Sequence, residues 1–171
     1  QVEFTLSGVH IDVPAAVLRL GALAGTTQPA RSAAQQLQER IQRLRNARRR
    51  SARPTVLLQV WDQPVYTVGG NQLLTDALAA CGYRNAYGDL RDAGPAVTLE
   101  SVLARDPAII VAVAPDQRSA ESWLLRWRRI PALQATRNGR LLALTDQRFS
   151  RLGPEAIDAS EALCTRLATL R

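Results

Sequence analysis

The chain has 171 residues, of which 46% are hydrophobic and 5% aromatic, and its formal net charge is +7 at pH 7. This length suffices for one sizeable hydrophobic core or two small ones, and the composition is typical of an α/β protein. No apolar run approaches the roughly 20 residues that a membrane-spanning helix needs, so we predict that the chain does not span a membrane.

The positive charge is concentrated in one short stretch of the chain. Residues 40–53 contain seven arginines, and the 15 arginines elsewhere balance the 15 acidic residues. Cations near the end of a helix are favoured by the helix dipole, so a solvated helix face is the preferred interpretation. An anionic partner or a membrane surface is the alternative. No aromatic residue interleaves with these arginines, so we predict no nucleic-acid partner.

The N-terminal third of the chain predicts one short strand and two helices. Residues 2–6 alternate as a strand does, and residues 12–25 predict a helix that opens at Pro14. A longer helix is predicted over residues 29–49, because apolar side chains recur there at helical spacing. These side chains are Ala33, Leu37, Ile41 and Leu44.

After Pro54 the chain alternates between apolar strands and amphipathic helices. This alternation predicts a three-layer α/β fold, in which a mostly parallel sheet carries helices on both faces. The predicted strands are 55–60, 84–87, 108–113 and 140–144, and the predicted helices are 71–81, 98–105, 117–128 and 154–169.

Several short motifs in this region resemble those of a known family. The first strand is followed by PVYTVGG at residues 64–70, and the next helix ends in CGYRN at residues 81–85. A turn RLGP at residues 151–154 precedes the last helix. The order of these motifs resembles the C-terminal lobe of the vitamin B12-binding proteins of bacterial ABC importers, the substrate-binding proteins with a helical backbone.

The resemblance implies a Rossmann-like lobe and a particular division of the chain. Residues 1–28 would be a remnant of an N-terminal lobe, residues 29–53 the interlobe backbone helix, and residues 54–171 the C-terminal α/β lobe. The chain therefore looks like the C-terminal two-thirds of such a protein. The family is secreted to the periplasm, so we expect a periplasmic location and a signal peptide that is not present in this sequence.

The two cysteines, Cys81 and Cys164, do not have the spacing of metal ligands, and one histidine cannot complete a zinc site. Two buried free thiols and one disulfide are both compatible with the residues alone. The resemblance favours a Cys81–Cys164 disulfide that joins two helices of one lobe, which implies an oxidising compartment.

The sequence contains no motif that predicts an enzyme. There is no G-x-S-x-G elbow, no P-loop and no G-x-G-x-x-G. Gly69 and Gly70 could offer backbone N–H groups to an anion, although a tight turn is the preferred interpretation. His10 is interpreted as a surface or capping residue. We therefore predict a protein that is not an enzyme and has no cofactor.

Two loops are predicted to meet at the carboxyl edge of the sheet, where ligands of open α/β sheets bind. The first loop carries Trp61 and Tyr66, and the second carries Gln147, Phe149 and Arg151. Flat aromatic side chains suit a planar macrocycle, and the polar ones could bond its peripheral groups. Packing of the aromatic rings beneath the loops is the alternative. Trp123 and Trp127, one helical turn apart, favour core or interlobe packing.

The resemblance also assigns roles to single residues. Tyr66 matches a loop aromatic that contacts the corrin, Arg151 matches the arginine of the turn, and Glu100 matches an acid that meets permease arginines during docking. Gly94-Pro95 stands where the family has a tryptophan. The implied function is capture of cobalamin and its delivery to an ABC permease in the inner membrane. The alternatives are a haem- or ferric-siderophore-binding protein of the same fold and a chelatase-like enzyme domain acting on a tetrapyrrole.

Overall fold

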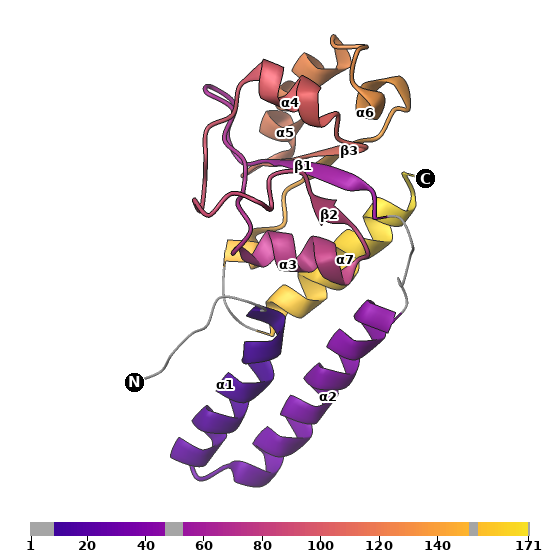
Figure 1. Ribbon diagram of the computed structural model, residues 1–171. Helices are drawn as coiled ribbons and strands as arrows, with labels where there is room; N and C mark the ends of the chain where they lie inside the picture. The colour runs from indigo at the N-terminus through magenta and orange to yellow at the C-terminus, as the bar shows by residue number, and fades with distance from the viewer. Residues whose placement is uncertain (1–8, 47–52, 151–153, 171) are drawn as a thin grey trace.

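The computed structural model describes residues 9–46, 53–150 and 154–170. A parallel sheet with helices on both faces forms the upper part of the molecule in Figure 1, and a hairpin of two long helices extends away from it. The predicted strand over residues 2–6 lies outside the described residues, as does Arg151.

The sheet has four strands in the order β2-β1-β3-β4, and each neighbouring pair is parallel. Strands β1 and β3 occupy the centre and are almost entirely buried, as expected for a parallel sheet covered on both faces. This topology confirms the predicted α/β fold. The strands are β1 (Thr55–Gln59), β2 (Arg84–Asn85), β3 (Ile109–Val113) and β4 (Leu141–Leu144).

The helices form a layer on each face of the sheet, and the alternation of strand side chains determines which layer each residue meets. Val56 and Leu58 pack with residues of α3 and α7, whereas Leu57 packs with residues of α4, α5 and α6. The short helices α6 and η1 were not predicted. The bounds are α3 (Leu73–Ala80), α4 (Leu99–Arg105), α5 (Gln117–Arg128), α6 (Gln134–Arg137), η1 (Gln147–Ser150) and α7 (Glu155–Ala168).

Helices α1 (Val9–Leu23) and α2 (Thr27–Asn46) form the hairpin. Helix α1 begins before the predicted residue 12, so Pro14 lies inside the helix. The two helices approach closely at Gly21, because a Cβ atom built there would lie 2.0 Å from the Cβ of Ala30. Glycine is therefore required at this crossing.

Arg40 attaches the hairpin to α7. Its Nη2 donates to Asp158 Oδ1 at 2.5 Å and to Glu161 Oε2 at 2.6 Å, and its Nε donates to Glu161 Oε1 at 3.0 Å. This fork geometry is the strong form of a charge-assisted pair, and the two carboxylates raise the pKa of Arg40. Leu37, Ile41 and Ile157 are buried together beside it. The angle between α2 and the lobe is thus defined by both charge and packing.

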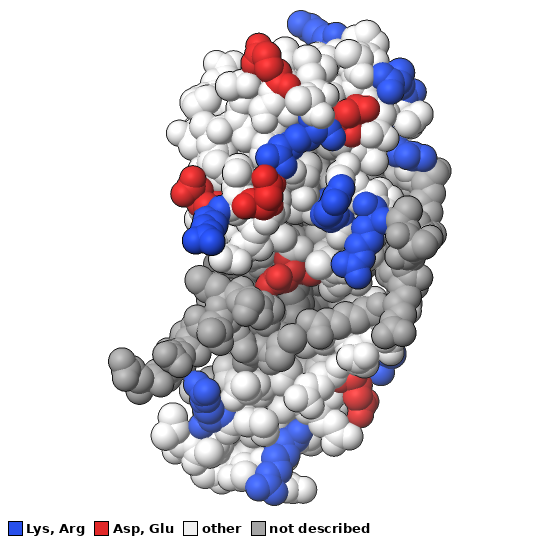
Figure 2. Space-filling view, in the orientation of Figure 1, with Lys and Arg blue, Asp and Glu red and all other residues white. Residues whose placement is uncertain are grey.

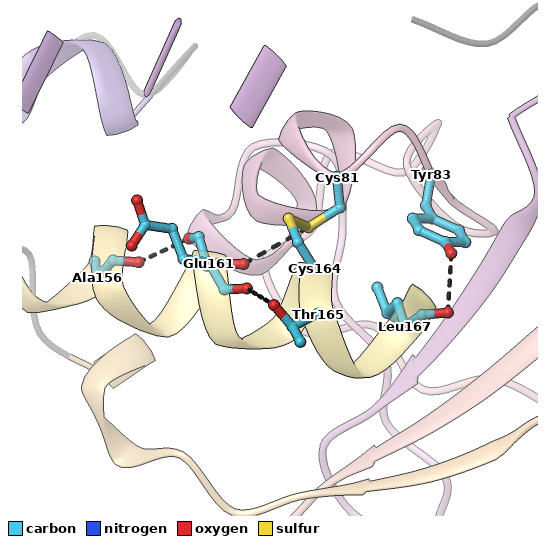
Figure 3. Close-up of a disulfide and its surroundings, with 8 residues drawn as sticks. Cys81, Tyr83, Ala156, Glu161, Cys164, Thr165 and Leu167 are labelled. Carbon is cyan, nitrogen blue, oxygen red and sulfur yellow. Dashed lines mark hydrogen bonds between the residues drawn. A yellow bond between two sulfur atoms is a disulfide. The ribbon is translucent and has the colours of Figure 1, made fainter. Parts of the chain in front are cut away.

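Cys81 and Cys164 form a disulfide, which confirms the predicted pairing. The bond joins the residue that follows α3 to the middle of α7, with a Cα–Cα distance of 5.0 Å. Both cysteines are almost completely buried. Close to the bridge in Figure 3, the hydroxyl of Tyr83 donates to the carbonyl of Leu167 at 3.0 Å. The segment that follows α3 is therefore linked to α7 both covalently and by a buried hydrogen bond.

We predict that the Cys81→Ala/Cys164→Ala variant loses about 4 kcal/mol of unfolding free energy, because the bridge closes a long loop in the unfolded chain. Denaturant unfolding of the oxidised protein, the reduced protein and the variant measures the difference. The reduced protein should match the variant. Two free thiols per chain in the denatured, non-reduced protein would contradict the bridge.

Candidate functional site

The parallel sheet brings the loops that follow β1 and β4 to one edge. Because parallel strands all end on the same side, the segments 60–72 and 145–150 both start at the carboxyl edge, where β3 separates their strands. Trp61 and Tyr66 lie in the first segment, and Gln147 and Phe149 lie in the second. We call these two segments the edge loops. The structure thus places four of the five predicted ligand-binding residues on two loops at the same edge of the sheet.

The first edge loop is a narrow turn with defined backbone pairing. The N–H of Val60 donates to the carbonyl of Tyr66 at 2.9 Å, and the N–H of Tyr66 donates to the carbonyl of Trp61 at 3.2 Å. Tyr66 also pairs with Ala96, which places the loop after β2 alongside. Trp61 is 57% exposed and Tyr66 is 36% exposed. Both rings are therefore accessible from solvent at this edge.

A buried amide holds the start of this loop. Gln59, the last residue of β1, is fully buried. Its Nε2 donates to the carbonyl of Trp61 at 3.2 Å and to Asp62 Oδ1 at 3.1 Å. Its Oε1 accepts from the indole N–H of Trp127 at 2.6 Å. A buried amide with all of these hydrogen-bond partners is held in one orientation. Gln59 therefore positions the backbone of Trp61 from the end of β1.

Trp61 is backed by a second indole. Its ring centroid lies 6.4 Å from that of Trp123 on α5, and the ring planes are tilted by 59°. Such tilted pairs are favourable aromatic contacts. Trp127, which is buried, lies in the core as the sequence predicts, whereas Trp123 is only partly buried and reaches the edge loop. Sequence reasoning missed this role of Trp123 and the role of Gln59. In the sequence, the role of Gln59 is indicated only by the presence of a polar residue at the end of an apolar strand.

The second edge loop is ordered by an ion pair. Asp146 accepts from the backbone N–H of Arg148 at 3.0 Å and from its Nε at 2.9 Å. The Arg148 side chain thereby lowers the pKa of the Asp146 carboxyl. Gln147, between them, is exposed. Phe149 is partly buried and packs against Leu73 and Ala156, so much of its ring is committed to the contact between α3 and α7.

Glu100 lies in the first turn of α4 and is exposed. Thr98 caps the helix by accepting from the N–H of Ser101 at 3.3 Å. A backbone N–H and the Thr98 hydroxyl lower the pKa of the Glu100 carboxyl, so it is charged at neutral pH. Ala96 pairs with Tyr66, and Glu100 follows only four residues later. The carboxylate thus follows, along the chain, the segment that pairs with the first edge loop.

The described part of the chain holds neither a metal centre nor a membrane span. No three of its His, Cys, Asp and Glu side chains lie close enough together to bind a metal ion. None of the helices within the described ranges combines the length and apolar content that crossing a bilayer requires.

We predict that Gln59→Leu disturbs the edge loop, because leucine fills a similar volume but leaves the Trp127 indole N–H without its acceptor. We expect a loss of about 2 kcal/mol in unfolding free energy and an altered near-ultraviolet circular dichroism signal from the tryptophans. Gln117→Leu, an exposed change of the same kind on α5, is the matched control. An unchanged aromatic signal in Gln59→Leu would show that this amide does not position Trp61.

A parallel α/β lobe with exposed aromatic side chains at its carboxyl edge has the architecture of a ligand-binding domain. The chain belongs to the periplasmic binding protein family, whose model matches residues 12–148. Members of this family are substrate-binding transport proteins that work without a cofactor, which confirms the prediction that the chain is not an enzyme. Membership of this family also implies a periplasmic location.

The similar proteins include binding proteins for different tetrapyrroles. The vitamin B12-binding protein of Yersinia pestis (strain Pestoides F) is 30% identical over 162 residues, which are 94% of this chain and 55% of that protein. The crystal structure of the vitamin B12-binding protein of Vibrio cholerae has a TM-score of 0.79 at 22% identity, covering 94% of this chain and 62% of that one. The haem-binding protein BhuT, with two haems bound, has a TM-score of 0.78 at 19% identity and coverages of 94% and 63%. The chain thus spans little more than half the length of its relatives.

Proposed function

We propose that this chain forms part of the substrate-binding protein of an ABC importer, which captures cobalamin in the periplasm and delivers it to the inner-membrane permease. The observation that carries the proposal is the exposed Trp61 indole. Its ring packs against Trp123, and its backbone carbonyl accepts from the side chain of Gln59. A large flat ligand gains most of its affinity from such preorganised aromatic surface. Because vitamin B12-binding proteins are among the similar proteins, cobalamin is the preferred candidate ligand.

The remaining side chains of the edge loops complete the proposed ligand wall. Tyr66 adds a second accessible ring, and Gln147 offers an exposed amide for peripheral groups of the corrin. Phe149 would contribute only the part of its ring that core packing leaves accessible. Arg151, which lies outside the described residues, follows directly on this loop in the sequence.

The helical hairpin supports the proposed division into residues 1–28, 29–53 and 54–171. Leu20 and Leu23 of α1 are 66% and 86% exposed. Exposed leucines on a helix that is apolar overall are typical of a surface that another part of a protein covers. We therefore assign residues 1–28 to an N-terminal lobe, and α2 to the backbone helix that holds both lobes at a fixed separation.

Haem or a ferric siderophore is the second candidate ligand. The accessible phenol of Tyr66 is a possible axial ligand for haem iron, and haem-binding proteins are among the structural neighbours. The chelatase-like enzyme is no longer an alternative, because the family consists of binding proteins.

Calorimetric titration of the full-length protein with cyanocobalamin, haemin and a ferric siderophore tests the ligand. We predict the tightest binding for cyanocobalamin and a loss of about tenfold or more in affinity for Trp61→Ala, because the change removes a preorganised stacking surface. Leu125→Ala, which truncates an exposed side chain on α5, is the control and should bind as the wild type does. If haemin bound more tightly than cyanocobalamin, and its absorption spectrum depended on Tyr66, the ligand would be haem and the cobalamin proposal would be wrong.

A second prediction separates docking from ligand binding. Glu100→Gln should leave ligand affinity unchanged and weaken the complex with the permease, because an exposed charge at a rim chiefly steers and orients association. Glu121→Gln, which removes an exposed carboxylate from α5, serves as the matched control. Both constants are measured on full-length proteins with the permease in nanodiscs. Lost ligand affinity with intact permease binding would place Glu100 at the ligand instead.

A further inference from the structure

A cavity of about 510 Å³ opens beside β2, at the free edge of the sheet. Its volume is in the range of small-molecule sites. None of the edge-loop residues Trp61, Tyr66, Gln147 and Phe149 lines it, so it is separate from the proposed ligand wall. Its charged lining consists of Arg53, Arg84, Asp89 and Arg105.

The neutral polar side chains of the cavity are already engaged within the protein. Asn85 Nδ2 donates to the carbonyl of Val68 and to Thr75 Oγ1, both at 2.7 Å, and Thr75 Oγ1 donates to the carbonyl of Gly69 at 2.7 Å. The Tyr83 hydroxyl is occupied by α7, so Tyr83 offers mainly its ring. Recognition in this cavity therefore depends on its charged side chains.

The charged lining is predominantly positive. Three arginines face one carboxylate, Asp89. Arg105 binds both oxygens of Asp89, at 2.6 and 2.9 Å, and lies over the Tyr87 ring at 4.3 Å. Arg53 and Arg84 are exposed, and no carboxylate in the described ranges pairs with either of them. Two guanidinium groups are thus available to an incoming anion.

The distribution of arginines in the sequence and on the surface also indicates positive charge at this cavity. Arg53, which lines this cavity, is the last residue of the arginine-rich stretch 40–53 of the sequence. On the face shown in Figure 2, arginine side chains gather where Figure 1 places β2. Clustered charge of one sign raises the local concentration of anions and their rate of association.

We propose that this cavity is a second binding site, which takes a phosphate group carried by a small molecule. The planar guanidinium groups of Arg53 and Arg84 match phosphate oxygens in the fork geometry that arginine favours. Ala79, Ala86 and the ring of Tyr83 provide an apolar floor for the rest of the ligand. A soluble phosphate ester and the headgroup of an anionic phospholipid share this chemistry.

Calorimetry of residues 1–171 with glycerol phosphate at constant ionic strength tests the site. The Arg53→Gln/Arg84→Gln variant should bind about tenfold more weakly or worse, because it loses both charged donors. Arg128→Gln/Arg129→Gln, an equal charge change on two exposed residues at the C-terminal end of α5, should bind as the wild type does. Thermal melting checks that both variants fold. An equal loss of affinity in the two double variants would show that the effect depends only on the net charge of the protein, and this would overturn the proposal.

Asp89→Asn gives a test in the opposite direction. It removes the carboxylate that engages Arg105, so glycerol phosphate should bind several-fold more tightly, whereas Glu121→Gln should have little effect. Sedimentation with vesicles of phosphatidylglycerol in phosphatidylcholine identifies the source of the phosphate. Vesicle binding that glycerol phosphate displaces indicates a lipid headgroup, and binding of glycerol phosphate alone indicates a soluble ester. Binding of neither probe by the folded wild-type chain would refute the site.

Discussion

The parallel pairing of β1, β3 and β4 is the constraint on which the candidate site depends. Parallel strands end at one edge of the sheet, so the loops that follow β1 and β4 both start there, although more than 80 residues separate them in the chain. The pairing is possible because helices cover both faces, and this cover requires strands that are apolar on both sides. Val56, Leu57 and Leu58 meet the requirement and are completely buried. Gln59 ends this apolar strand, and the first edge loop begins directly after it.

Three attachments convert the lobe into a rigid platform. The disulfide fixes α3 to α7 on one face of the sheet, Arg40 fixes the hairpin to α7, and Gln59 fixes the edge loop to α5. Each attachment joins segments that are distant in sequence. Together they hold the lobe around Trp61 in place while its indole stays exposed. A binding lobe of this kind loses little conformational entropy when a ligand arrives.

Much of the fold could be predicted because its signals are local. Helices α4 and α5 were predicted within one residue, and in the structure Thr98 and Asp116 cap them by accepting from backbone N–H groups of the first turn. Helix α6 was missed, since four residues are too few to show a helical period. The sequence also suggested the two edge loops, because they follow predicted strands of a parallel sheet, whose carboxyl edge binds ligands, and because they carry aromatic residues.

The parts of the site that escaped prediction depend on contacts between distant segments. Trp123 and Trp127 have the same helical context in the sequence, yet only Trp127 is buried, because Gln59 receives its N–H while Trp123 lies beside Trp61. The cavity at β2 could not be foreseen either. It depends on a strand of two residues and on the pairing of Arg105 with Asp89, which is 16 positions away.

Hydrogen–deuterium exchange of the full-length protein, with and without cyanocobalamin, tests the central claim that the ligand lies against the edge loops. The account predicts slower exchange at residues 60–66 and 145–149 in the presence of ligand, with little change at β2 and α3. Protection confined to β2 and α3, with no change in the edge loops under saturating ligand, would contradict it.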